Sequence, residues 1–183
     1  MRAAVSRESV LPSADRKLPV AGAGEVRVRV MNQDGAGVVD ALGEGVRDLE
    51  PGDRVWLWAA ETTQDYVVLP RHQAVRMHDY VPFEVGALLG LPALKAHRCL
   101  TRATGGPDRL TPGSLAGRTV LIADGAGPIG TAAIQLAKWA GATVEDSAGT
   151  PLDTADLDLT PEETANAVAA VAEAVNAGAF RQP

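Results

Sequence analysis

The spacing of hydrophobic residues changes near residue 82, which divides the chain into two halves of different character. In the first half, residues 25–30 (EVRVRV) alternate between charged and apolar positions with the period of two that is typical of a strand. Further β-rich runs follow at residues 35–42, 54–58 and 65–69, and clusters of Gly, Pro and Asp lie between them. This half is therefore predicted to form a β-barrel or a β-sandwich.

In the second half, apolar residues recur at helical spacing. The run from Phe83 to Cys99 predicts a helix, which Gly90 and Pro92 should bend or divide. The stretch 104–117 is rich in Gly, Pro and Thr and predicts a loop.

The loop leads to a predicted β-α-β unit. Residues 119–123 (TVLIA) predict a buried strand, residues 131–140 a helix with one apolar face, and residues 142–144 a second short strand. Beyond it, residues 145–160 are acidic and turn-rich. A last helix is expected to begin at Pro161, with Thr160 as its N-cap, and to end near Gly178.

The turn inside this unit has the G-x-G-x-x-G spacing of a dinucleotide-binding loop. Such glycines allow a tight turn, close approach of the backbone to a pyrophosphate, and close packing of the helix on the strand. The alternative is a purely structural glycine turn. The residues predicted to bind the cofactor are Gly125, Ala126, Gly127, Pro128, Ile129 and Gly130.

Glu145 and Asp146 lie about 20 residues after the first glycine, where a Rossmann unit often has an acid that binds the ribose 2′-hydroxyl. Two acids at the end of a strand that stops at Val144 can equally mark where the chain leaves the sheet for water. These residues do not distinguish NAD from NADP.

Charge and composition argue against nucleic-acid binding, a membrane span and a disulfide. The 183 residues have a net charge of −6 and a pI near 5.0, and their seventeen basic residues are scattered, so nucleic acid is not an expected partner. The apolar stretches are too short for a membrane span and no apolar signal region follows Met1, which predicts a cytoplasmic protein. Cys99 is the only cysteine, so an intrachain disulfide is excluded.

Several ordered blocks resemble the medium-chain dehydrogenase/reductase superfamily, and in particular its zinc-free quinone oxidoreductase branch. The blocks are MRAAV at residues 1–5, GEVRVRV at 24–30, DGAGVV at 34–39 continuing through GEGV at 43–46 to PGDRV at 51–55, DYVVLP at 65–70, ALLGLPAL at 87–94, and 119–144 around the glycine turn.

The resemblance implies an α/β fold in two parts. Residues 1–82 would form a GroES-like β-barrel catalytic domain, and residues 83–183 a helical linker with a partial, doubly wound Rossmann domain. The implied activity is NAD(P)H-dependent hydride transfer to a small quinone, enone or carbonyl compound. The resemblance alone favours NADP over NAD, and it makes a homodimer plausible.

The resemblance also bears on metal and catalytic residues. Zinc-dependent members have Gly-His-Glu where this chain has Asn32-Gln33-Asp34, and His72, His78 and His97 do not form a ligand spacing, so no metal is expected. These histidines are expected to be exposed or partly buried.

The implied substrate cleft would lie near Gln33, with Tyr66 and Lys95 as weak catalytic candidates. The structural alternatives are core packing for Tyr66 and an exposed helix position for Lys95.

Two pieces of the family pattern are missing. Only Met31 to Gln33 stand where the family has a longer segment beside the cofactor cleft, and only 39 residues follow Val144, too few for the remaining strands of a six-stranded sheet. The chain is either a shortened form of a longer reductase or a remnant that kept the scaffold without hydride chemistry.

Two other functions compete with a reductase. One is a non-redox cyclase, isomerase or small-molecule binding protein, whose cleft Trp56 and Trp58 would line unless they pack in the barrel. The other is an interaction module, in which strand edges left open pair with another chain.

Overall fold

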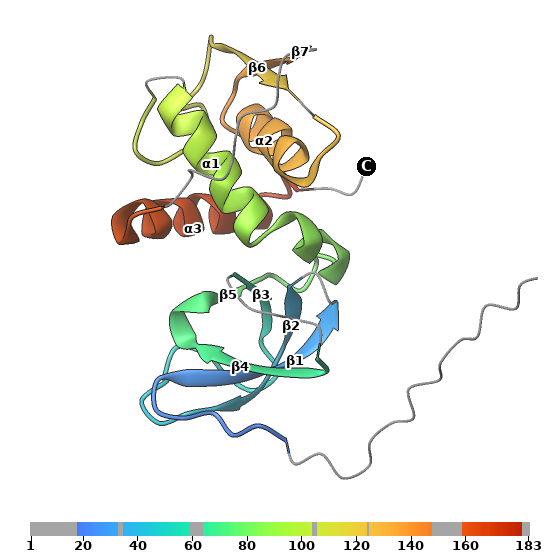
Figure 1. Cartoon of the computed structure of the whole chain (residues 1–183), viewed down its shortest axis with the longest axis vertical. Helices are drawn as coiled ribbons and strands as arrows, with labels where there is room; N and C mark the ends of the chain where they lie inside the picture. The colour runs from blue at the N-terminus through green and yellow to red at the C-terminus, as the bar shows by residue number, and fades with distance from the viewer. Residues whose placement is uncertain are drawn as a thin grey trace, which may run out of the picture.

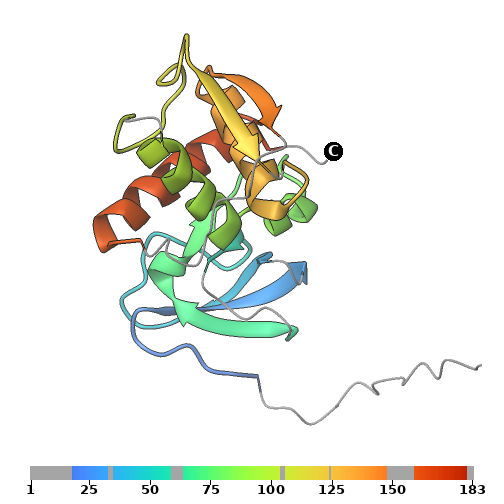
Figure 2. The same ribbon diagram turned by 45° about the horizontal axis from the view of Figure 1, so that its top comes forward.

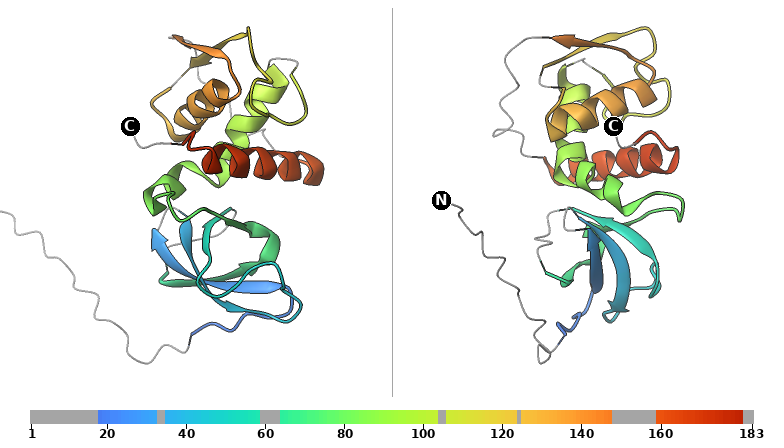
Figure 3. Two further views of the ribbon diagram at one scale, coloured as in Figure 1. Left: turned by 180° about the vertical axis from the view of Figure 1, so that it is seen from behind. Right: turned by 90° about the vertical axis from the view of Figure 1, so that its right-hand side faces the viewer.

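The computed structural model describes residues 18–32, 35–58, 64–103, 106–123, 125–147 and 159–180. A curled β-sheet forms one end of the molecule, and helices with a small second sheet form the other end (Figures 1 and 3). None of the helices described is both long and apolar enough to cross a lipid bilayer.

The first half forms a five-stranded antiparallel sheet of order β4-β1-β2-β3-β5. Val26 and Val28 of the first strand point into its core, while Arg27 and Arg29 point outward, as the alternating sequence predicts. The elements are β1 (Glu25–Asn32), β2 (Ala36–Leu42), β3 (Arg54–Leu57), β4 (Tyr66–Pro70), the 3-10 turn η1 (Arg71–Gln73) and β5 (Ala74–Arg76).

A short hairpin joins β1 to β2. Asn32 pairs with Ala36, so only three residues connect the two strands, and Gly35 takes a φ of 106° that other residues rarely adopt. The connection between β1 and β2 is therefore short, as the sequence predicts.

In the second half, the described residues form three α-helices, one 3-10 helix and two parallel strands. The elements are the 3-10 helix η2 (Phe83–Leu88), α1 (Leu91–Ala103), β6 (Thr119–Ala123), α2 (Pro128–Trp139), β7 (Thr143–Ser147) and α3 (Pro161–Asn176). Gly90, with a φ of +63°, separates η2 from α1, so the predicted division of this helical run is confirmed. Pro92 is tolerated because it lies in the first turn of α1.

The β-α-β unit is confirmed, with corrected bounds. β6 and β7 pair in parallel from Thr119 opposite Thr143 to Ala123 opposite Ser147, and α2 is the crossover helix between them. Helix α2 begins at Pro128, three residues earlier than predicted. β7 runs on to Ser147, so Glu145 and Asp146 belong to the strand and do not mark where the chain leaves the sheet.

β6 is not the fully buried strand that the sequence predicts. Val120 and Ile122 are buried, but Leu121 is 64% exposed. The strand alternates because α2 covers one face of this small sheet, whereas Leu121 points from the other face (Figure 2).

Helix α3 begins where the sequence predicts. The Glu163 amide donates to the Thr160 hydroxyl at 3.3 Å, and the Thr160 amide donates to the Glu163 carboxylate at 2.9 Å, which together form a capping box. The helix ends at Asn176, just before Gly178, which has a φ of +72°.

The apolar core continues from the sheet into the helices. One cluster of buried side chains lies inside the curled sheet. A larger cluster extends from Ala36 and Trp56 through η2 to α1, α2 and α3. The domain division at residue 82 stays a prediction.

A matched pair of leucines tests this packing. Leu136 of α2 is fully buried, so Leu136→Ala should lower the free energy of unfolding by about 2–5 kcal/mol. Leu121→Ala, on the exposed face of β6, should cost less than about 1 kcal/mol. Urea unfolding measures both values, and equal losses would show that a further element covers Leu121.

Candidate functional site

The glycine turn joins the end of β6 to the start of α2. Gly127 is the N-cap, with φ −73° and ψ 162°, and Gly130 is buried in the first turn of the helix. The Thr131 amide donates to the Gly127 carbonyl at 2.8 Å, and the Thr131 hydroxyl donates to the Gly125 carbonyl at 3.1 Å. The described residues therefore have the strand-turn-helix arrangement that the G-x-G-x-x-G spacing predicts.

The amino-terminal end of α2 is open to an anion. It has no side-chain cap and no acidic residue in its first turn. Helix α3 differs, since the side chains of Thr160 and Glu163 already occupy its amino-terminal end. Because the first N–H groups of a helix have no partner within the helix and lie at the positive end of its dipole, the turn before α2 fits a phosphate group.

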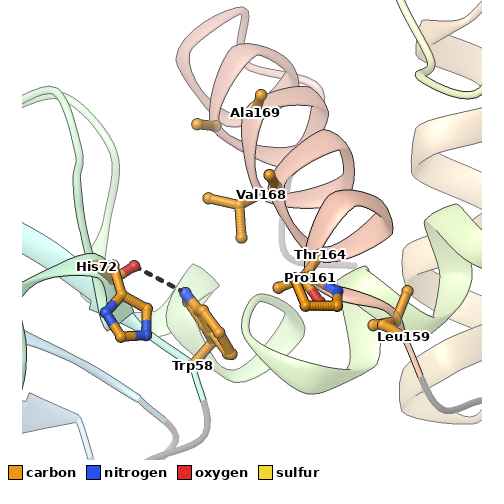
Figure 4. Close-up of a pocket in the computed structure, with 9 residues that line it drawn as sticks. Trp58, His72, Leu159, Pro161, Thr164, Val168 and Ala169 are labelled. Atoms are coloured by element: carbon orange, nitrogen blue, oxygen red, sulfur yellow. Dashed lines mark hydrogen bonds between the residues drawn. The ribbon is translucent and has the colours of Figure 1, made fainter.

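A separate pocket of 610 Å³ lies between the sheet and α3 (Figure 4). Trp58 and His72 form one side, and Leu159, Pro161, Thr164 and Val168 are among the residues of the other side. No residue of the glycine turn lines this pocket. The chain thus has two distinct candidate sites, one suited to an anion and one mainly apolar.

The structure distinguishes the two tryptophans that the sequence left open. Trp56 is fully buried in the core, whereas Trp58 is half-buried and lines the pocket. The indole Nε1 of Trp58 donates to the His72 carbonyl at 3.1 Å, and the two rings meet edge to face with centroids 5.7 Å apart.

The candidate substrate residues do not come together. Tyr66 pairs with Arg29 on the outer face of the sheet, and the Arg27 guanidinium lies 6.0 Å from the centre of its ring, so the alternative of core packing is wrong. Lys95 lies on α1 and is half-buried rather than exposed. Gln33 lies outside the described residues, and the proposed roles of these three side chains stay predictions.

The acidic residues of β7 are placed only in part. Glu145 is exposed and pairs with Leu121, on the face of the small sheet opposite to α2. Asp146 lies in the same strand, and its side chain lies outside the described part of the structure. A role in ribose binding stays a prediction.

Comparison with known proteins finds similarity to polyketide synthases and to quinone oxidoreductases. No protein-family model matches it. It is 38% identical over 109 residues to the highly reducing polyketide synthase anuA of Penicillium roqueforti, and 29% identical over 119 residues to the human quinone oxidoreductase. The solved quinone oxidoreductase of Pseudomonas syringae is 27% identical, with a TM-score of 0.54 over 87% of this chain.

These similarities confirm the resemblance to the medium-chain dehydrogenase/reductase superfamily. The predicted fold class, a mixed α/β chain with a partial GroES-like and Rossmann arrangement, is confirmed. The matches cover 60% of this chain and 5% of the polyketide synthase, and 64% of this chain and 34% of the human enzyme. The chain spans 52% of the solved superfamily member from Pseudomonas syringae.

The α3 side of the pocket could not be predicted from the sequence. Trp58 and Val168 are far apart in the sequence, and no local pattern links a tryptophan after a strand to a helix near the other end. The one available signal was that α3 has more apolar positions than a single buried face needs, since Ala165, Val168 and Ala169 lie outside the set buried in the core.

His97 is more deeply buried than the sequence predicts. It is 2% exposed, and its Nε2 accepts a hydrogen bond from the Leu110 amide at 3.2 Å. Burial, with a smaller contribution from the charge of Arg109, lowers the pKa of His97 to about 4. Within the described residues, no three His, Cys, Asp or Glu side chains group as metal ligands would, so His97 acts as a neutral acceptor in the core.

The buried His97 predicts how stability depends on pH. Between pH 6.5 and about 4 the unfolded chain binds a proton at this position that the folded chain does not, so the free energy of unfolding falls as the pH falls. Between pH 6.5 and 4.5 this loss should be roughly 2 kcal/mol. The range stops at pH 4.5 because the pKa of Glu163 is lowered from this ordinary value in the folded chain, so Glu163 also contributes at lower pH.

His97→Gln keeps a hydrogen-bond acceptor but cannot titrate, so it should flatten the pH dependence over that range. Urea unfolding at several pH values measures the slope. The exposed His72 and His78 remain in both proteins and cancel in the comparison. An unchanged slope in the variant would contradict the assignment.

Proposed function

We propose that this chain is a zinc-free, NAD(P)H-dependent reductase of the quinone or enone type. The observation that carries the proposal is the uncapped amino-terminal end of α2, directly after the glycine turn. The similarity of the chain to quinone oxidoreductases also supports this proposal. Hydride transfer to a small carbonyl or quinone-like substrate, the choice of NADP over NAD, a homodimer and a cytoplasmic location all belong to this proposal.

The glycine turn would hold the pyrophosphate of the cofactor. The backbone N–H groups of Ile129 and Gly130 lie in the first helical turn. Pro128 has no N–H group, but its fixed φ suits the first position of the helix. Ala126 is exposed beside them, so the approach to the turn is open. When bound, the reduced nicotinamide would supply the hydride, and the chain's own groups would bind and orient the reactants.

The absence of zinc is part of the proposal for a chemical reason. Gln33 stands where zinc-dependent relatives have histidine, and an amide is a weak ligand for zinc where an imidazole is required. Chelator treatment should therefore leave cofactor binding and any reductase activity unchanged, whereas a loss that zinc restores would contradict this part.

A substitution at Gly127 tests the pyrophosphate site without breaking the helix. The φ and ψ of Gly127 are open to any residue, and Asp is a favourable N-cap. Gly127→Asp should therefore keep or raise thermal stability while its charge opposes a phosphate. Its affinity for NADPH or NADH, followed by cofactor fluorescence, should fall about tenfold or more.

The control is Gly127→Asn, which has nearly the same size and capping ability without the charge. It should weaken cofactor binding much less than Gly127→Asp. If neither cofactor binds the unmodified protein at millimolar concentration, the proposal fails. If Asp and Asn have the same effect, the turn does not act through charge.

A further inference from the structure

The pocket between the sheet and α3 has the properties of a ligand site of its own. Its 610 Å³ falls within the range of about 300–1,000 Å³ that small-molecule sites occupy. It lies apart from the glycine turn, so its occupant need not be the cofactor.

One wall of the pocket is an indole ring that is held in place. Trp58 is half-buried, and the hydrogen bond from its Nε1 to the His72 carbonyl satisfies its polar group. The edge-to-face contact with the His72 ring limits rotation further. A ligand therefore meets a broad apolar surface whose orientation is already fixed (Figure 4).

The opposite wall consists of small apolar side chains. Val168 points from α3 toward Trp58, and Leu159 lies near the start of the helix (Figure 4). Ala169 also lines this wall. Small side chains facing a large planar one leave room for a flat molecule.

The lining also selects against charge. None of the described residues that line the pocket carries a carboxylate, an ammonium or a guanidinium group. Its polar side chains are the His72 imidazole and the Thr164 hydroxyl, which donates to the Thr160 carbonyl at 2.9 Å and keeps its lone pairs free to accept. A charged ligand would lose hydration here without gaining a partner.

The helical wall is held at both ends. Near its start, the buried guanidinium of Arg98 forms an ion pair with Glu163, which lowers the pKa of Glu163 to about 2. Near its end, the Tyr80 hydroxyl donates to the Asn176 carbonyl, and Arg109 pairs with Glu173 at 2.9 Å. The pocket is thus formed before any ligand arrives.

We propose that this pocket binds a neutral, flat, apolar small molecule, which inserts between Trp58 and α3 with one polar group directed toward His72. The volume of 610 Å³ matches that of a small molecule. The neutral lining sets its charge, and the facing walls set its shape.

Two fluorescent probes test the proposal. N-phenylnaphthylamine is neutral, and anilinonaphthalene sulfonate has the same aromatic groups with an added sulfonate. The neutral probe should bind the intact protein with one-to-one stoichiometry and at least about tenfold more tightly than the sulfonate, because the pocket offers the charge no partner.

Matched substitutions on α3 locate the site. Ala169→Leu extends into the pocket and should weaken binding of the neutral probe about tenfold or more, because the added atoms overfill the space. Ala177→Leu makes the same change at the exposed end of the helix and should leave the affinity unchanged. Trp58→Phe, which loses the hydrogen bond to His72, is a second pocket variant in case Ala169→Leu folds poorly.

Several results would overturn the proposal. Equal affinity for the two probes, or equal effects of Ala169→Leu and Ala177→Leu, would show general surface binding. A change of oligomeric state in Ala169→Leu, measured by light scattering, would show that this face contacts another protein chain. Gly127→Asp should keep the probe site, so failure of the pocket and failure of the cofactor proposal are separate results.

Discussion

The packing of α1 against both other helices is the constraint on which the rest of the structure depends. Its buried residues, among them Leu94 and Leu100, join the core that α2 and α3 share. Helix α2 carries the glycine turn, and α3 carries one wall of the pocket, so α1 fixes the relative position of the two candidate sites. Because Arg98 of α1 is buried and paired with Glu163, removing either partner would leave the other charge uncompensated.

The two sites use opposite physical chemistry. At the start of α2, backbone amides and the helix dipole favour an anion, and the lack of a side-chain cap leaves that position available. At the pocket, the corresponding end of α3 is already satisfied by its own capping box, and the surface that remains is apolar. The start of a helix would therefore bind an anion in α2, whereas in α3 it would form part of a neutral wall.

Among the described residues, the small parallel sheet is covered by α2 on one face only. Parallel sheets are normally covered on both faces, yet β6 exposes Leu121 and β7 exposes Glu145 on the face away from α2. The chain spans about half the length of the solved quinone oxidoreductase that it matches. Among the described residues, the parallel sheet consists of the single β-α-β unit β6-α2-β7. That unit carries the glycine turn that we propose holds the pyrophosphate.

Local chemistry in the sequence was enough to predict the β-rich first half, the division at Gly90, the β-α-β unit and the capped start of α3, because each depends on neighbouring residues. The glycine turn was predicted for the same reason, with spacing and flanking elements a few residues apart. Only the tertiary structure could decide that Trp58 faces α3, that His97 is buried and that Leu121 is exposed. These outcomes depend on which distant segments pack against a side chain. The residues next to Trp58, His97 and Leu121 in the sequence do not predict that packing.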